Sequence, residues 1–444
     1  MLNRRQIMQG AALAGVALHT GVAQAATGPE PIVFLHGDSD QASIWQKVIW
    51  RFESNGYPAN LLFPIDFVNP KARDDNSKPQ ANRTSTDDEL KQITAYVAMV
   101  LAKTGATKVV MIASSRGGYA IRNYLAQPGN AAHVSKAILC GTPNHGVFAI
   151  PALLGSEYNG MGAFLKGLNG GPSEVVAGVD FMTLRSDGND KYAQPDGRFL
   201  GHPGMKTNIT AEGPALKGAL NLVLPGVDHR GTAFTPQAFR EQFKFITGRE
   251  PAFIAITPEP EVTLNGRVTG MVGDVPTNLP VAGAKVEVYR VSQITGERMG
   301  AALLTKTTAA DGIWGPLKVD SKSALEFVIA APGQFITHIY KPPIPRSFDK
   351  LNLRPAPAAV KADAGAAAVL VMSCPRGYFG LPRDIVIFDG KQPKDVTPGV
   401  PTDPKSTLRL ADATARPVIA EWNDIRVVGR PWPAKDNHRV ILEV

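Results

Sequence analysis

Ser115 stands in a sequence that would make its hydroxyl an exposed nucleophile. It lies in the pattern Ala-x-Ser-x-Gly-Gly, after the apolar run 108–113 and before the helical pattern 119–125, and Ala113 takes the place of the usual first glycine. A tight turn between a buried strand and a helix presents a serine for attack on a carbonyl carbon. Two alternatives remain open: Ser114, whose spacing to the next glycine is one residue too long, or a glycine-rich turn with an incidental serine.

His229 is the candidate general base for this serine. A hydroxyl is a poor nucleophile at neutral pH and needs a neighbouring imidazole to take its proton. His229 follows the apolar run 222–224 and precedes the amphipathic run 236–246, so we expect it on a loop between a strand and a helix. The competitor is His145, within Gly-Thr-Pro-Asn-His-Gly, and a surface histidine without a chemical role is the other interpretation of His229.

The third side chain that this chemistry requires is a carboxylate, which accepts the second imidazole N–H and fixes the tautomer of the base. The segment 181–196 follows a predicted strand and offers Asp190 as the preferred acid and Asp187 as the main alternative. Asp180 and Asp196 are less favoured. Each of the four has the alternative interpretation of a solvated loop carboxylate.

The elements that must position these side chains are those of an α/β fold. The first half of the chain alternates apolar runs with helical patterns, which is typical of a mostly parallel sheet flanked by helices. Strands are expected at 31–35, 108–113 and 136–140, and helices at 87–104 and 119–125. Thr86 is the expected N-cap of the first of these helices.

The second half has the residue pattern of an all-β region. From about residue 251 the sequence alternates apolar and polar residues between turn signals, which predicts a β-sandwich at 260–340. A proline-rich stretch and an Ala/Pro-rich stretch lead to a further β-rich region at 341–444, and the sequence leaves open whether this region is separate or completes the sandwich. The catalytic domain is expected at 26–250.

Residues 31–248 resemble bacterial lipases and esterases of the α/β-hydrolase superfamily. The resemblance rests on Phe-Leu-His-Gly, Ser-Arg-Gly-Gly, Gly-Thr-Pro-Asn-His-Gly and Val-Asp-His, and it covers about half of the chain. In that fold the serine, the acid and the histidine follow in this order, which disfavours His145. The resemblance also implies an oxyanion hole formed by the backbone N–H groups of Asp38 and Arg116, with His36 in a structural role.

Residues 262–335 resemble the carboxypeptidase-regulatory or transthyretin-like β-sandwich. The similarity rests on Gly-Arg-Val-Thr-Gly, Leu-Pro-Val-Ala-Gly-Ala and Thr-Thr-Ala-Ala-Asp-Gly. Some lipases carry such a β region near the side that binds the acyl chain, so the resemblance implies a role in substrate access.

The segment 148–179 is rich in glycine and apolar residues and is expected at the edge of the site. It is either a lid over an acyl pocket or a fixed wall, and both interpretations stay open. Phe164 and Leu165 are the side chains expected at the pocket, with packing against the sheet as the alternative.

Residues 1–25 are predicted to be an export signal. Arg4 and Arg5 precede an apolar stretch that ends in the small-residue site Ala-Gln-Ala, so the mature chain is expected to begin near Ala26. The arginine pair resembles a twin-arginine signal, although the ordinary secretory route also fits. The protein is therefore expected to be periplasmic or secreted, without a stable membrane span.

Composition excludes several other classes of protein. The net charge of +8 comes from scattered lysines and arginines without a run of five or more, which gives nucleic-acid binding little support. The two cysteines lie far apart, and Cys140 ends an apolar run, so we expect buried free thiols rather than a Cys140–Cys374 disulfide. The oligomeric state cannot be read from the sequence.

Taken together, these residues predict a serine hydrolase of carboxylic esters, a lipase or carboxylesterase, that needs no metal and no organic cofactor. The expected partner is a small-molecule, lipid or polyester substrate with an apolar acyl chain. The alternatives are an extracellular polyester depolymerase, an amidase or peptidase with the same three side chains, and a catalytically silent binding protein.

Overall fold

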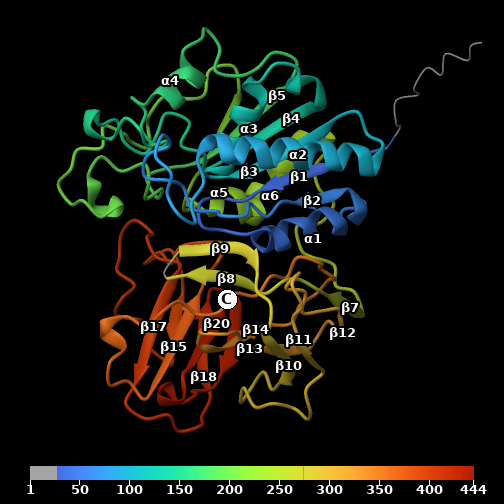
Figure 1. Ribbon diagram of the computed structural model, residues 1–444, viewed down its shortest axis with the longest axis vertical. Coiled ribbons are helices and arrows are strands. Elements are labelled where there is room, and N and C mark those ends of the chain that lie inside the picture. Colours follow the sequence, from blue (N-terminus) through green and yellow to red (C-terminus); the bar gives the residue numbers. More distant parts are fainter. Residues whose placement is uncertain (1–27, 274) are drawn as a thin grey trace, which may run out of the picture.

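A parallel six-stranded sheet forms the centre of the N-terminal lobe (Figure 1) of the computed structural model, which describes residues 28–273 and 275–444. Its strand order is β2-β1-β3-β4-β5-β6, and every neighbouring pair is parallel. The strands are β1 (Ile32–Leu35), β2 (Leu62–Pro64), β3 (Val109–Ser114), β4 (Val134–Cys140), β5 (Asp180–Ser186) and β6 (Leu220–Leu224). The predicted strands at 31–35, 108–113 and 136–140 are therefore confirmed.

Helices cover both faces of this sheet. The α-helices are α1 (Gln46–Ser54), α2 (Thr86–Thr104), α3 (Gly117–Ala126), α4 (Ala163–Asn169), α5 (Gly231–Phe234) and α6 (Pro236–Thr247). On one face, α2 and α3 bury Ile93, Val97 and Ile121 against the sheet, and on the other face α1 and α6 bury Phe52 and Phe239. The α/β fold class predicted from the sequence is confirmed.

The prediction of Thr86 as the N-cap of α2 is wrong by one residue. Ser85 is the N-cap: its hydroxyl accepts from the Asp88 N–H, and the Asp88 carboxylate accepts from the Ser85 N–H in return. Because this capping box satisfies two N–H groups at the start of the helix, the first turn begins at Thr86.

The C-terminal lobe is built around a seven-stranded sheet of order β11-β10-β13-β14-β20-β15-β17. Smaller sheets pair β7 with β12, β8 with β9, and β16 and β19 with β18. The bounds are β7 (Glu261–Leu264), β8 (Thr269–Val272), β9 (Val275–Pro280), β10 (Lys285–Val291), β11 (Leu304–Thr307), β12 (Leu317–Asp320), β13 (Ala324–Ala330), β14 (Ile336–Lys341), β15 (Ala368–Ser373), β16 (Val386–Phe388), β17 (Lys405–Leu410), β18 (Val418–Trp422), β19 (Ile425–Gly429) and β20 (His438–Glu443).

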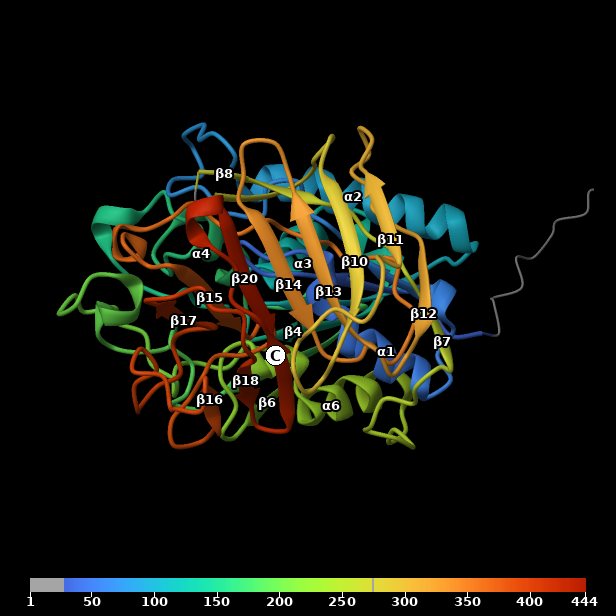
Figure 2. The ribbon, with the colours of Figure 1, turned by 90° about the horizontal axis from the view of Figure 1, so that it is seen from below.

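The last strand decides how the two β regions are related. Figure 2 shows β20 beside β14, and β20 lies between β14 and β15, parallel to both. The sheet therefore continues across residue 341, so the region 341–444 completes the same sheet to which β10, β13 and β14 belong.

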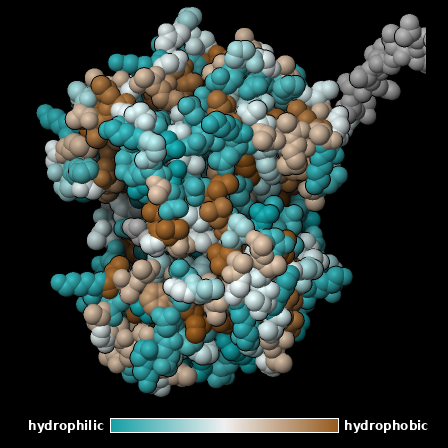
Figure 3. Space-filling view, viewed as in Figure 1, coloured by the Kyte–Doolittle hydropathy of each residue, from teal (hydrophilic) through white to brown (hydrophobic). Residues whose placement is uncertain are grey.

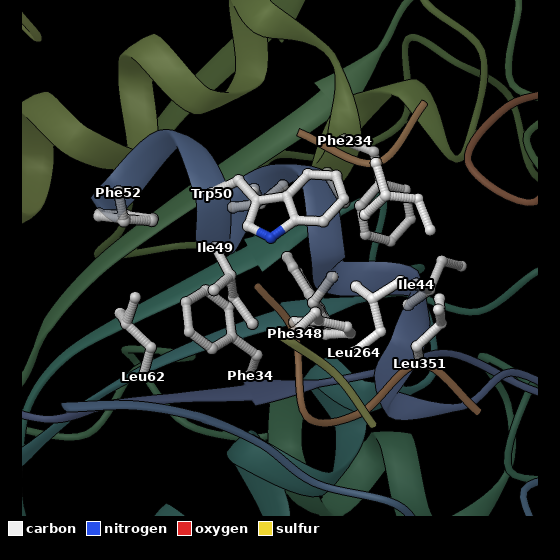
Figure 4. Close-up of a cluster of buried hydrophobic side chains, with 14 of the residues drawn as sticks. Phe34, Ile44, Ile49, Trp50, Phe52, Leu62, Phe234, Leu264, Phe348 and Leu351 are labelled. Atoms are coloured by element: carbon white, nitrogen blue, oxygen red, sulfur yellow. The ribbon is translucent and has the colours of Figure 1, made fainter. Parts of the chain in front are cut away.

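One hydrophobic core joins the two lobes. Figure 4 shows Phe34 and Trp50 of the first lobe together with Leu264, Phe348 and Leu351 of the second, all in one cluster of buried side chains. The indole N–H of Trp50 also donates to the carbonyl of Ser347 at 3.0 Å. Hydrophobic residues also lie close to the boundary between the lobes on the face seen in Figure 3.

The predicted export signal, residues 1–25, lies outside the described residues. Within residues 28–273 and 275–444, no helix has both the length and the apolar character needed to cross a membrane. Cys140 and Cys374 are both buried and free, as expected, and burial raises the pKa of each thiol to about 12.

Candidate active site

Ser115 lies on a strained turn between β3 and α3. Its φ of 52° is in the left-handed region, which a residue with a side chain adopts at a cost. The turn is held by the Ser115 N–H, which donates to the carbonyl of Cys140 at 2.7 Å. A Cβ on Gly117 would lie 2.7 Å from the carbonyl oxygen of His36, so glycine is required where α3 begins. The strand, turn and helix around Ser115 are those that the sequence predicted.

The structure brings Ser115, His229 and Asp190 into one chain of contacts. His229 Nε2 lies 2.9 Å from Ser115 Oγ, and His229 Nδ1 lies 2.9 Å from Asp190 Oδ2. Since an ionised carboxylate only accepts hydrogen bonds, Nδ1 carries the proton and Nε2 is left to accept from the serine hydroxyl. The other oxygen of Asp190 accepts from the Tyr192 N–H at 2.8 Å, which fixes the carboxylate.

The other acids proposed from the sequence are occupied elsewhere. Asp187 accepts from the backbone N–H groups of Gly226 and Asn189. Asp180 pairs with Lys136 at 3.0 Å, and Asp196 accepts from the Arg198 N–H at the start of a 3₁₀ helix. None of these contacts involves His229.

His145 and His36 both have structural partners. His145 Nε2 lies 3.1 Å from Glu174 Oε1. His36 is buried, with Nδ1 2.9 Å from the carbonyl of Gly37 and Nε2 accepting from the Phe67 N–H at 3.1 Å. Burial lowers the pKa of His36 below its ordinary value, so this imidazole stays neutral.

The backbone N–H groups of Asp38 and Arg116 are free to bind an oxyanion. In the part of the chain that the structure describes, neither N–H has a hydrogen-bond acceptor. Asp38 lines the same cavity as Ser115 and His229. Its carboxylate accepts from the Tyr158 hydroxyl at 2.8 Å and from the Ala72 N–H at 3.0 Å, so the side chain is held by other groups.

A buried cluster of charged side chains holds the turn that carries Ser115. The Arg116 guanidinium is fully buried and makes a two-pronged contact with Glu157, at 2.5 and 2.9 Å, and its Nη1 lies 2.7 Å from Glu89. Burial raises the pKa of Glu89 to about 8, and the Arg116 charge only partly opposes this. Burial raises the pKa of Asp38, but the charge of Arg116 together with hydrogen bonds from Ser39 and Ala72 outweighs it, so this pKa lies below its ordinary value. The cluster anchors Arg116, whose N–H stands beside the nucleophile.

Ser115 and His229 open into a cavity of about 530 Å³. Its apolar and aromatic walls are Pro143, Val147, Phe148, Leu153, Tyr158, Tyr192, Leu200, Met205 and Tyr378. The tyrosine ring of Tyr192 packs edge-on against His229, with ring centroids 4.7 Å apart. Such walls suit an apolar acyl chain beside the nucleophile.

The cavity walls differ from the sequence-based prediction. Neither Phe164 nor Leu165 lines the cavity, because Leu165 is fully buried and Phe164 packs against Tyr119 at 5.7 Å. Other residues of the insertion 148–179, including Phe148 and Tyr158, take that place. Leu200, Met205 and Tyr378 were missed: Leu200 ends a short 3₁₀ helix, Met205 and Tyr378 lie on irregular segments, and none of these carries a periodic pattern.

The loop that carries His229 is tied to the C-terminal lobe. Asp228 Oδ2 accepts from the Tyr378 N–H at 3.2 Å and from Arg383 at 3.1 Å. On the other side of the histidine, Arg230 donates to Asp40 at 2.8 Å and to the carbonyl of Pro375. The second lobe therefore helps to position the imidazole.

Within the described residues, no group of three or more histidine, cysteine, aspartate or glutamate side chains is arranged to hold a metal ion.

Two family models match this chain. The model described as Lipase (class 2) matches residues 29–143, and the lipase C-terminal domain matches residues 260–357. The second match covers the region that resembles the transthyretin-like sandwich, and that finer resemblance stays a prediction.

Solved structures also match. Lipase B of Aspergillus fumigatus is 14% identical over 52% of this chain and 55% of its own, with a TM-score of 0.36, so the match spans little more than half of that protein. A mature lipase of Bacillus licheniformis is 19% identical over 50% of this chain and 92% of its own (TM-score 0.33). The phospholipase PlaB of Legionella pneumophila is 13% identical over 73% of this chain and 94% of its own (TM-score 0.33).

The parallel sheet and the serine on the turn after β3 define the class of the N-terminal lobe as an α/β-hydrolase fold. Both matching family models are lipase domains, and they support an ester hydrolase with an ester or lipid substrate.

Proposed function

We propose that this protein is a serine hydrolase of carboxylic esters, a lipase or carboxylesterase that works through an acyl-enzyme. The observation that carries the proposal is the contact chain from Asp190 through His229 to Ser115, which ends in a cavity with apolar walls. A catalytically silent binding protein of the same fold would not need these contacts between Asp190, His229 and Ser115.

In the proposed mechanism, His229 Nε2 takes the proton of Ser115 as Oγ attacks the ester carbonyl carbon. The N–H groups of Asp38 and Arg116 donate to the oxyanion of the tetrahedral intermediate. His229 then gives its proton to the leaving alcohol, and a water molecule, deprotonated in the same way, attacks the acyl-enzyme and releases the acid. Throughout, Asp190 stabilises the imidazolium.

The proposal includes export. It is supported by the sequence of residues 1–25, with its arginine pair and small-residue site before Ala26. Sequencing the N-terminus of protein recovered from the periplasm or the medium tests it, because a chain that still begins at Met1 would contradict cleavage.

The test of the activity is hydrolysis of nitrophenyl esters with short to long acyl chains by protein that begins at Ala26. We expect Ser115→Ala and His229→Ala each to lose activity by about 10³-fold or more, because each removes a group that acts in the transition state. His145→Ala is the matched control and retains activity, since His145 contacts Glu174 instead.

Acyl-chain preference in this assay separates esterase from lipase. Activity that survives in Ser115→Ala, or that is lost equally in His145→Ala, would contradict the proposed mechanism. Hydrolysis of amides but of no ester would assign the same side chains to an amidase.

A further inference from the structure

A second large cavity lies between the two lobes. It has a volume of about 590 Å³, and its walls come from residues 39–46 of the first lobe and, in the second, from residues 351–360 and strands β14, β15, β17 and β20. Ser39, Asp40 and Arg230 line both this cavity and the one that contains Ser115. The interlobe cavity is therefore next to the proposed catalytic cavity, with the Asp40–Arg230 ion pair between them.

Positive charges exceed negative charges in the interlobe cavity. Five cationic side chains line it, against two carboxylates. The cations are Arg230, Lys341, Arg354, Arg376 and Lys405, and the carboxylates are Asp40 and Glu443. Both carboxylates are already paired, Asp40 with Arg230 and Glu443 with Lys341 and Arg376. Among the described residues, Arg354 and Lys405 have no carboxylate within ion-pair distance.

The walls also carry hydrogen-bond donors without acceptors. Arg354 Nη2 donates to Asn278 Oδ1 at 2.6 Å, but its Nε is buried and has no partner among the described residues. Gln46, which is only 6% exposed, lines the same cavity, and its Nε2 is likewise without a partner there. The side chain of Lys405 is exposed, and its ammonium has no hydrogen-bond partner in the described part of the chain. Because the Arg354 and Gln46 nitrogens have almost no accessible surface, a ligand in the cavity would meet the accessible part of Arg354 and the exposed Lys405 instead.

Two cationic side chains at the cavity have lowered pKa values. Burial lowers the pKa of Arg354 to about 10, although the carboxylates of Asp40 and Asp66 partly oppose this. Enclosure by the protein, and then the charges of Arg230 and Arg354, lower the pKa of Lys405. An anion in the cavity would favour the charged form of both side chains.

Apolar side chains complete the walls. Met271, Ile339, Leu353 and Ile441 line the cavity beside the cations. A simple inorganic anion would leave this apolar surface unused, whereas a carboxylate with a hydrocarbon chain would contact both parts of the wall.

We propose that the interlobe cavity is a carboxylate-binding site, and that its ligand is the acid released by ester hydrolysis in the adjacent cavity. The source of the ligand rests on the proposed function, whereas the site itself rests on Arg354, Lys405 and the apolar side chains beside them. Hydrolysis releases an apolar acid that is ionised at neutral pH, and this acid has to move only past the Asp40–Arg230 pair to reach the unpaired cations.

The experiment is calorimetric titration of octanoate at pH 7 into the Ser115→Ala protein, which keeps both cavities and does not turn over. Arg354→Gln and Lys405→Gln are then added singly on this background. Each removes one charged donor, so we expect octanoate affinity to fall about tenfold in either variant. Because Arg354 also bridges Asn278 and Ser39, Lys405→Gln keeps the test decisive if Arg354→Gln does not fold.

Two controls locate the binding site. Lys71→Gln removes the lysine that lines the proposed catalytic cavity, and we expect no loss of octanoate affinity. Lys318→Gln removes an exposed charge elsewhere, and it too should leave affinity unchanged. A loss of octanoate affinity in Lys71→Gln but not in Lys405→Gln would overturn the proposal, because the carboxylate would then lie beside Ser115.

Two further titrations define the ligand. Octanol has the same chain without the charge, and equal loss of octanol and octanoate affinity in Lys405→Gln would overturn a carboxylate site. Inorganic phosphate that binds more tightly than octanoate would also overturn it. Octanoate binding that depends on Lys405, in a protein whose wild type hydrolyses no ester, would support the site and contradict only the proposed function.

Discussion

Two histidines in this protein have similar partners but different surroundings. In the N-terminal lobe, His229 contacts Asp190 through Nδ1 and Ser115 through Nε2, both at 2.9 Å. In the C-terminal lobe, His338 contacts Glu326 through Nδ1 at 2.7 Å and His438 through Nε2 at 2.8 Å. A carboxylate-bound imidazole is therefore no mark of a catalytic site by itself.

The partner on Nε2 and the space around it make the difference. Ser115 is partly exposed to a cavity and stands beside two free N–H groups, whereas His338 is 1% exposed and stacks on Trp432, with ring centroids 4.1 Å apart. Nε2 of His338 accepts from the imidazole N–H of His438. No hydroxyl therefore lies where His338 could activate it as a nucleophile. The first arrangement can act on a substrate, and the second can only hold strands β13, β14 and β20 together.

The largest expected effect separates the two carboxylates in the first lobe. Asp190→Asn should lower kcat/KM for a nitrophenyl ester by about 10³- to 10⁴-fold, because an amide on Nδ1 favours the wrong tautomer of His229. Asp187→Asn is the matched change three residues away and should retain most activity, since Asp187 binds the backbone of Gly226 instead. Steady-state kinetics on both variants checks this, and a larger loss in Asp187→Asn would show that the acid is misassigned.

The corresponding change in the second lobe should act on stability alone. Glu326→Gln leaves the partly buried Arg298 without its carboxylate and should lower the free energy of unfolding by about 2 kcal/mol. Urea unfolding followed by tryptophan fluorescence measures this. The kcat of the folded variant should be unchanged, and a drop in kcat without a change in the unfolding midpoint would refute the comparison.

The smallest effect concerns pH. Burial lowers the pKa of His338 below its ordinary value, although the Glu326 carboxylate raises it. Below about pH 6.5 the unfolded chain therefore binds a proton that the folded protein does not, so the free energy of unfolding falls as the pH falls. His338→Phe keeps a ring against Trp432 and should reduce this slope by up to about 1 kcal/mol per pH unit between pH 6.5 and 5.

Unfolding curves of the wild type and His338→Phe across this pH range make the measurement. Some slope should remain in the variant, because burial also lowers the pKa of His36. An unchanged slope in His338→Phe would mean that His338 is protonated in the folded protein.

The nucleophile could be predicted from sequence because its setting is local. Ser115 lies within a few residues of the strand and the helix that position it, and His229 lies between β6 and the short helix α5. Asp190 is the acid preferred from the sequence over Asp187, but no local pattern separates the two, since both follow β5 within four residues. The two acids differ in their partners, because the Gly226 N–H donates to Asp187 and leaves Asp190 to His229. Gly226 is distant in sequence, so this contact cannot be read from a local pattern.

Contacts between distant segments explain the rest of what the sequence did not reveal. Alternating residues predicted strands in the second half, but nothing in the pattern places β20 between β14 and β15. Tyr378 reaches the catalytic cavity from an irregular segment far along the chain. The interlobe cavity likewise combines Gln46, Arg354 and Lys405, which no local pattern connects.

The contacts on either side of His229 also bear on the order in which the parts of the proposed site form during synthesis. Asp228 and Arg230 are held by Pro375, Tyr378 and Arg383, and these residues leave the ribosome only when more than four fifths of the chain has been made. A nascent chain that has completed only the parallel sheet holds Ser115 on its turn but lacks the groups that secure the base. Under the proposed function, the groups on both sides of His229 are therefore all in place only near the end of translation.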